Sequence, residues 1–119
     1  MRNLIFKSGK GTFHPLEINE ILWIEGIKGR TIIHLLDRKL NVNIRFKDVL
    51  ISLGDNFIQC HRSSAVNTLK ITQFSSKNIF LNSTELVLSK SYKVAFMDKM
   101  LDESKLLIKR LFLLKHIFN

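Results

Sequence analysis

The stretch Phe57-Ile58-Gln59-Cys60-His61-Arg62-Ser63-Ser64-Ala65-Val66-Asn67 places the most reactive residue types of the chain in one run. Residues 57–60 are predicted to form a strand, and a turn follows the strand end. A cysteine, a histidine, an arginine and two serines in a row raise three interpretations: a nucleophile, a metal site or a turn that binds an anion. The residues outside this run decide between them.

A nucleophile and a metal site are both disfavoured by the spacing. Neighbours on a strand point to opposite faces, so His61 cannot readily deprotonate Cys60. The other histidines are His14, His34 and His116, which lie in three separate predicted elements. One cysteine and scattered histidines lack the clustered spacing of a metal site. We therefore expect no enzyme, no small-molecule substrate, no metal and no cofactor, with Cys60 as a small buried apolar side chain.

The charge of the chain favours a polyanionic partner. Nineteen Lys and Arg oppose ten Asp and Glu, which gives a net charge of +9 and a pI near 10.0. Such an excess suits nucleic acid or an anionic membrane, whereas a basic surface without a special partner is the plainer alternative. The lone cysteine indicates a reducing compartment, and neither a signal peptide nor a membrane-spanning run is visible. We expect a cytoplasmic protein.

The hydrophobic pattern predicts mostly β structure with two helical segments. Phe46, Val49, Leu50 and Leu53 recur at helical spacing, and Gly54 ends that short helix. From residue 91 to the end there is no glycine or proline, and apolar residues trace a helical stripe. Short apolar or alternating runs predict strands near 5–6 and at 21–24, 31–36, 39–44, 57–60, 71–74, 78–81 and 85–88. Residues 65–67 fit no single interpretation.

Three basic segments fall in predicted turns or at element ends. Lys28-Gly29-Arg30 lies between two strands, Arg62-Ser63-Ser64 combines a guanidinium with two hydroxyls, and Ser89-Lys90-Ser91-Tyr92-Lys93 repeats that combination at a helix start. Hydroxyls, backbone amides and a helix N-terminus all suit phosphate oxygens. Each segment alone would be a solvated charge, but together they predict a face that binds duplex DNA.

The opening run resembles the central signature of the LytTR DNA-binding domain family, which is an aromatic residue, a spacer of two or three residues and then His-x-Ser-x-x-Val-Asn. Residues 19–25 are similar to the family's early Ile-x-x-Ile-Glu strand, and residues 46–50 to its short helix. Residues 86–92 are similar to its closing motif of apolar residues before Ser-Arg-Arg-Tyr. The resemblance covers roughly residues 13–101 in the family's order, and the His-x-Ser-x-x-Val-Asn core is its most specific part.

The resemblance implies an elongated stack of small β-sheets with one short mid-chain helix and a C-terminal helix. Such domains bind DNA through loops and commonly bend it. They serve bacterial transcription regulation, often behind a receiver domain in two-component (phosphorelay) response regulators, and often as homodimers on paired sites. We expect a LytTR-type domain at 1–101 and a helical extension at 102–119, with any receiver domain or sensor partner acting in trans.

The family's DNA contacts, carried onto matching positions, fall on the three basic segments. Lys28 and Arg30 match the loop that enters a major groove, and an arginine fork at Arg30 suits guanine. Arg62 and Ser63 match contacts near the groove floor and the backbone. The closing motif contributes the remaining candidates, among which a serine stands where the family has its second arginine: Ser89, Lys90, Ser91 and Lys93.

The remaining positions of the signature and the tail carry further expectations. His61 is expected to order the turn and Asn67 to be structural. Residues 102–119 are too apolar for a free solvated helix, and they would pack on the domain, form a homodimer or lie on a membrane. The rival function is a protein-partner or membrane-surface module that keeps the fold without specific DNA readout, motivated by Ser91 and by this tail.

Overall fold

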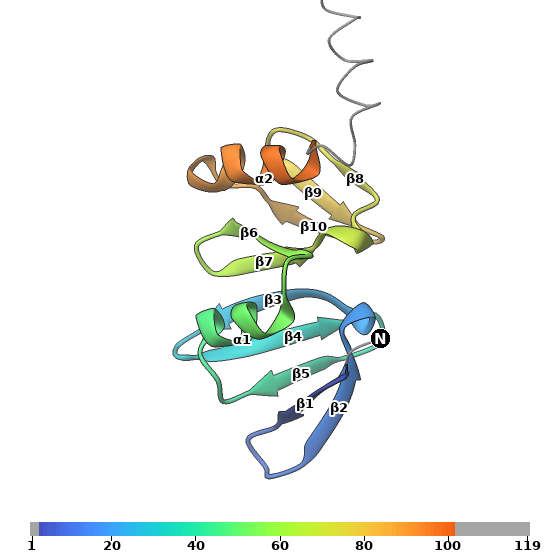
Figure 1. Cartoon of the computed structure of the whole chain (residues 1–119), viewed down its shortest axis with the longest axis vertical. Helices are drawn as coiled ribbons and strands as arrows, with labels where there is room; N and C mark the ends of the chain where they lie inside the picture. Colours follow the sequence, from blue (N-terminus) through green and yellow to red (C-terminus); the bar gives the residue numbers. More distant parts are fainter. Residues whose placement is uncertain (1–2, 102–119) are drawn as a thin grey trace, which may run out of the picture.

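The computed structural model describes residues 3–101, and the extension predicted at 102–119 lies outside the described residues. The described part measures 59 × 30 × 25 Å, and its radius of gyration is 15.9 Å. A compact domain of about 100 residues has a radius of gyration near 13 Å. The molecule is therefore elongated, with small sheets stacked along its long axis (Figure 1).

The described residues form three antiparallel sheets. Their strands are β1 (Asn3–Lys7), β2 (Phe13–Glu17), β3 (Ile21–Ile27), β4 (Arg30–Leu35), β5 (Lys39–Val42), β6 (Phe57–His61), β7 (Ser64–Asn67), β8 (Gln73–Phe74), β9 (Asn78–Leu81) and β10 (Thr84–Val87). The orders are β1-β2, β5-β4-β3-β7-β6 and β10-β9-β8. This arrangement confirms the predicted mostly β fold.

Two helices cover the stack, and both lie where the pattern predicts them. Helix α1 (Phe46–Leu53) ends at Gly54, whose φ of 88° suits glycine, and helix α2 (Lys93–Met100) follows the third sheet. Short 3-10 turns occupy Ile18–Glu20 (η1), Thr68–Lys70 (η2) and Lys90–Tyr92 (η3). Within residues 3–101, no helix is long and apolar enough to cross a membrane.

The central sheet separates two hydrophobic cores. On β7, Ala65 joins the core beneath α1 and Val66 joins the core beneath α2, and both side chains are fully buried. Neighbours on a strand point to opposite faces, so one strand serves both cores. Burial on both faces removes the polar–apolar alternation of a one-sided strand, which explains why the sequence of this segment was ambiguous.

One predicted strand is shorter than expected for an identifiable reason. The pattern predicted a strand at 39–44, but β5 ends at Val42. The hydroxyl of Thr31, a buried residue, donates a hydrogen bond of 2.7 Å to the carbonyl of Ile44. This bond satisfies a buried hydroxyl and occupies a carbonyl just past the end of the ladder, where the chain turns toward α1.

Candidate nucleic-acid interface

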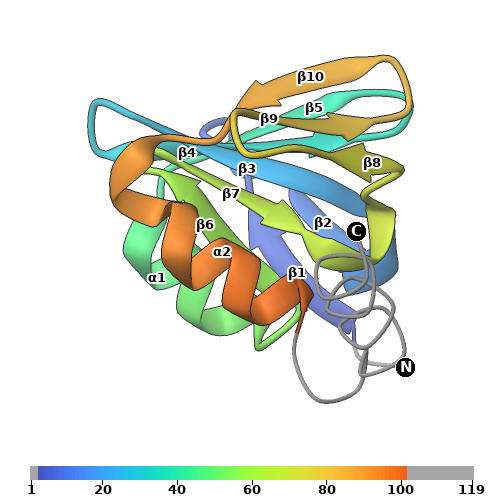
Figure 2. The same ribbon diagram turned by 90° about the horizontal axis from the view of Figure 1, so that it is seen from above.

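Three connections between elements lie along one long edge of the molecule. They are the β3–β4 turn, the β6–β7 turn and the segment that links β10 to α2, all on the left side of Figure 1. The view from above places the β3–β4 turn and the segment before α2 on the same side (Figure 2). These connections carry the three basic segments of the sequence, so the fold aligns these segments on one edge, here called the basic edge.

The β3–β4 turn projects two cations from a tight hairpin. Ile27 pairs with Arg30, which leaves Lys28 and Gly29 as a two-residue loop with φ values of 48° and 80°. Positive φ at both positions is typical of the type I′ hairpin turn. Lys28 thus stands at the tip, whereas Arg30 is the first residue of β4 rather than part of the loop. Both side chains are exposed.

The β6–β7 turn is ordered by the histidine of the signature. His61 Nδ1 accepts a hydrogen bond of 3.3 Å from the backbone N–H of Ser63 and lies 3.2 Å from the Ser63 hydroxyl. The carbonyl of Ser63 accepts a bond of 2.8 Å from the N–H of Gly26 on β3. The predicted structural role of His61 is confirmed, and the turn that carries exposed Arg62 is held against the end of β3.

Asn67 at the end of β7 is also structural, as predicted. Its side chain is 1% exposed, and its Nδ2 donates to the carbonyl of Ile21 at 2.9 Å. Its Oδ1 accepts from the N–H of Leu69 at 3.1 Å. These bonds join β7 to the start of β3 and to η2, away from the basic edge.

The third basic segment is attached to the second through β6. The N–H of Ser89 donates to the carbonyl of Cys60 at 2.9 Å. The Gln59 amide donates to the carbonyl of Arg62 at 3.2 Å and to the Tyr92 hydroxyl at 3.3 Å. Of the predicted contact residues in this segment, Lys90 and Ser91 are exposed and Ser89 and Lys93 are half-buried. A continuous set of hydrogen bonds thus spaces the three segments.

The first two segments meet around one depression of about 550 Å³, here called the central hollow. Its lining includes Lys28 and Arg30 from one turn and Arg62 and Ser63 from the other. The rest of its lining comes from the end of β3, the β3–β4 turn, Arg45 and helix α1: Gly26, Ile27, Gly29, Arg45, Phe46, Lys47, Asp48 and Ile51. The Ser89–Lys93 segment does not line this hollow but continues the same edge.

Two cations of the central hollow were missed by the sequence interpretation. Arg45 and Lys47 flank Phe46 at the N-terminal end of α1, and both are exposed. Arg45 Nε lies 3.4 Å from Asp48 Oδ2, so one carboxylate partly offsets the local charge. Two basic residues around the first residue of a predicted helix were the available signal, since a helix N-terminus is suited to binding phosphate.

The thiol of the signature takes no part in this edge. Cys60 is fully buried, and its Sγ lies 3.7 Å from the carbonyl of Ser64, to which it donates. Burial raises the pKa of the Cys60 thiol to about 11. A thiol with so high a pKa is protonated near pH 7 and is a poor nucleophile. Within residues 3–101, no three His, Cys, Asp or Glu side chains are grouped closely enough to hold a metal ion.

Comparison with known proteins agrees with this architecture. The family model of the LytTr DNA-binding domain matches residues 11–101. A solved structure with a TM-score of 0.68 is the LytTr DNA-binding domain of a protein assigned as a methyl-accepting/DNA response regulator from Bacillus cereus. The two chains are 20% identical over 85% of this chain and 97% of the other, which shows a shared fold. No curated protein sequence matches the chain.

Proposed function

The chain belongs to the LytTR DNA-binding domain family, and from this premise we propose that it is a sequence-specific transcription regulator that binds duplex DNA along its basic edge. The β3–β4 turn, the β6–β7 turn and the segment before α2 would contact the duplex. The family match supports a DNA-binding module, and the proposal adds which side chains would bind the DNA backbone and which would contact bases.

The convergence of cations from separate segments supports this proposal most directly. Arg30, Arg62 and Lys47 come from β4, the β6–β7 turn and α1, yet they line one hollow of about 550 Å³ with Lys28 and Arg45. Like charges gathered on one surface repel, and the repulsion destabilises the free fold. A bound polyanion neutralises these cations and releases its own condensed counterions, and both effects favour binding.

The geometry of each connection suggests a different task. The β3–β4 turn is narrow and projects beyond the sheet, so it suits entry into a major groove, where the Arg30 guanidinium can donate two bonds to a guanine edge. Arg62 and Ser63 on the second turn suit the backbone. Lys90 and Lys93, with the hydroxyls of the same segment, would hold phosphates and fix the register of the domain on the duplex.

The regulatory context is part of the same proposal. A bacterial two-component response regulator in the cytoplasm is the setting that the family implies, with a receiver domain or sensor as its partner. The segment 102–119 would then mediate a homodimer that places two domains on paired sites. Apolar residues are frequent in this segment, so it suits burial against a second protein surface.

The test is selection from a random-sequence duplex pool at rising salt, followed by sequencing of the retained DNA. We expect a recurring motif and a steep loss of affinity with salt. The double variant Lys28→Ala, Arg30→Ala should lose the motif, whereas Lys39→Ala, an exposed lysine at the far end of the β4–β5 hairpin, should keep it. Retention without any motif would favour the rival protein-partner or membrane-surface module.

A further inference from the structure

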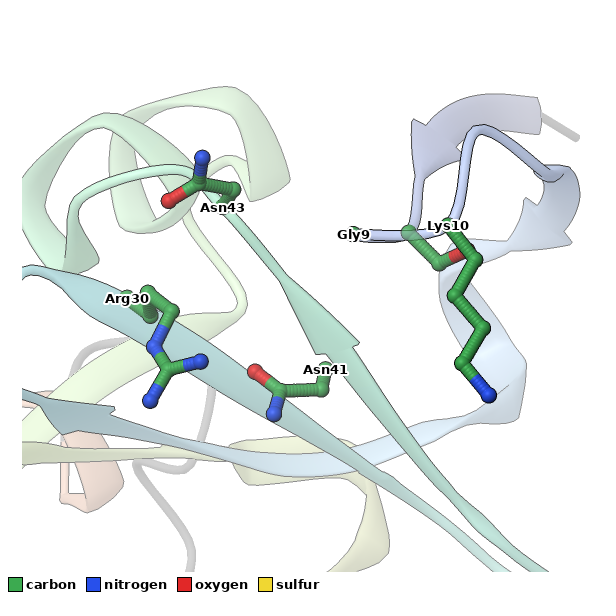
Figure 3. A pocket seen from close by; sticks show the side chains of 6 residues that line it. Gly9, Lys10, Arg30, Asn41 and Asn43 are labelled. Carbon is green, nitrogen blue, oxygen red and sulfur yellow. The ribbon is translucent and has the colours of Figure 1, made fainter.

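A second depression lies beside the β3–β4 turn, on the side away from the β6–β7 turn. This hairpin hollow has a volume of about 380 Å³ and lies between the β1–β2 turn and the outer face of β4 and β5 (Figure 3). None of the residues predicted from the sequence lines it except Arg30. Its lining residues are Ser8, Gly9, Lys10, Arg30, Asn41 and Asn43.

The register of β4 and β5 turns three of these side chains outward. Thr31 and Val42 are paired and fully buried. Side chains alternate along a strand, so Arg30, Asn41 and Asn43, which flank that pair, face the other way, and all three are exposed. The sheet therefore presents one guanidinium and two amides on a single outer surface.

The N-terminal hairpin closes the other side of the hollow. A β-bridge between Ser8 and Val42 joins the β1–β2 turn to the end of β5. Within that turn, the N–H of Ser8 donates to the carbonyl of Thr12 at 2.9 Å, and the N–H of Gly11 donates to the carbonyl of Ser8 at 3.1 Å. The turn is thus fixed, and it carries exposed Lys10 across the gap from Arg30.

The chemistry of the lining suits an anion with several oxygens. Figure 3 shows the Arg30 guanidinium and the Asn41 amide turned toward one another, whereas Lys10 stands on the far side of the gap with its ammonium turned away from them in this view. Guanidinium, ammonium and amide NH₂ groups all donate to phosphate oxygens. The central hollow includes the carboxylate of Asp48, whereas none of the described residues that line the hairpin hollow is acidic.

We propose that the hairpin hollow seats one backbone phosphate of the bound duplex, beyond the groove that the β3–β4 turn would enter. Arg30 lines both hollows, so the two sites form one continuous track along the edge. The N-terminal hairpin then lengthens the DNA interface by one phosphate contact and adds affinity without reading sequence. This inference rests on the proposed function.

The first test compares salt dependence on the selected duplex. The double variant Lys10→Ala, Asn43→Ala removes two exposed side chains, so the fold is retained, and Lys39→Ala at the start of β5 is the matched control. The plot of log K against log salt has a negative slope, and loss of one phosphate contact makes this slope shallower by about 0.9. The affinity gap between wild type and double variant should therefore shrink about 3.5-fold between roughly 50 and 200 mM salt. Lys39→Ala should keep the wild-type slope.

The second test neutralises single phosphates of that duplex as methylphosphonates. Wild type should weaken at one position next to the motif where the double variant Lys10→Ala, Asn43→Ala is indifferent. Equal slopes and equal sensitivity at every position would overturn the inference while leaving the proposed function intact. A wild type that binds no duplex at all would overturn both. Saturation of the hollow by inorganic phosphate alone, with an unchanged DNA slope, would assign it to a free anion and also overturn the inference.

Discussion

Replacing Asn67 by alanine is expected to lower the free energy of unfolding by about 3 kcal/mol without removing any DNA contact. The side chain is 1% exposed and spans two elements. Its Nδ2 donates to the Ile21 carbonyl at 2.9 Å, and its Oδ1 accepts from the Leu69 N–H at 3.1 Å. These bonds tie the end of β7 to the start of β3 and cap the first turn of η2.

The magnitude follows from what each bond leaves behind. Ile21 has no exposed surface, so its carbonyl loses a donor that water cannot readily replace, at a cost of about 1–3 kcal/mol. Leu69 is 64% exposed, so its N–H can bind water, and the loss there is that of an N-cap, about 1 kcal/mol. For a domain of this size, a loss near 3 kcal/mol lowers Tm by roughly 12–24 °C.

Thermal and urea unfolding of Asn67→Ala measure this loss, with Asn78→Ala as the matched control. Asn78 also makes a side-chain hydrogen bond, 2.7 Å to Glu85 Oε2, but at the surface, so its removal should cost less than about 1 kcal/mol. DNA affinity, measured below the melting range and expressed per folded molecule, should match wild type. Melting within a few degrees of wild type would refute the burial argument, and lost affinity in a fully folded variant would place Asn67 on the DNA.

Two further residues give testable expectations. Gly29→Ala should destabilise the fold by about 1 kcal/mol, because Gly29 has a φ of 80°, which an alanine adopts only with strain. An added Cβ would meet no atom within 4 Å, so backbone strain is the whole effect. An unchanged urea midpoint would contradict the positive φ. Cys60→Ser should lower stability by about 1–3 kcal/mol, because it buries a hydroxyl, and should leave DNA affinity per folded molecule unchanged, as binding and urea titrations can show. The pKa of the Cys60 thiol is raised from 9.0 to about 11, so the thiol of the unfolded chain ionises at lower pH than that of the folded chain. The free energy of unfolding should therefore fall as pH rises from about 9 to 11. Iodoacetamide should label the folded chain more slowly than the unfolded chain near pH 8.

Several elements could be predicted because their signals are local. The spacing of Phe46, Val49 and Leu53 predicted α1, and Val49 and Leu53 are indeed buried. The alternation that begins at Lys39 predicted the strand β5 because one face of that strand is buried and the other is exposed. The signature from Phe57 to Asn67 likewise identified the family, and the ordering role of His61 depends on contacts within three residues.

Strand pairing, in contrast, could not be read from local pattern. Residues 65–67 were ambiguous because β7 lies between β3 and β6 and is buried on both faces, which leaves no period to detect. The predicted strand at 71–74 reduced to Gln73–Phe74 because only these two residues pair with β9. The β3–β7 pairing joins residues far apart in the chain, such as Trp23 and Val66, and these contacts exist only after the chain has folded.

Local sequence patterns were sufficient to assign the mostly β class, the family and three basic segments, because each depends on neighbouring residues. Which charges lie together depends instead on how distant strands pair. The order β5-β4-β3-β7-β6 places Arg30 and Arg62 around one hollow with Arg45 and Lys47, and the bridge from Ser8 to β5 brings the β1–β2 turn to the other side of Arg30. Composition records the same charges in any arrangement, whereas long-range antiparallel pairing gathers them on one edge.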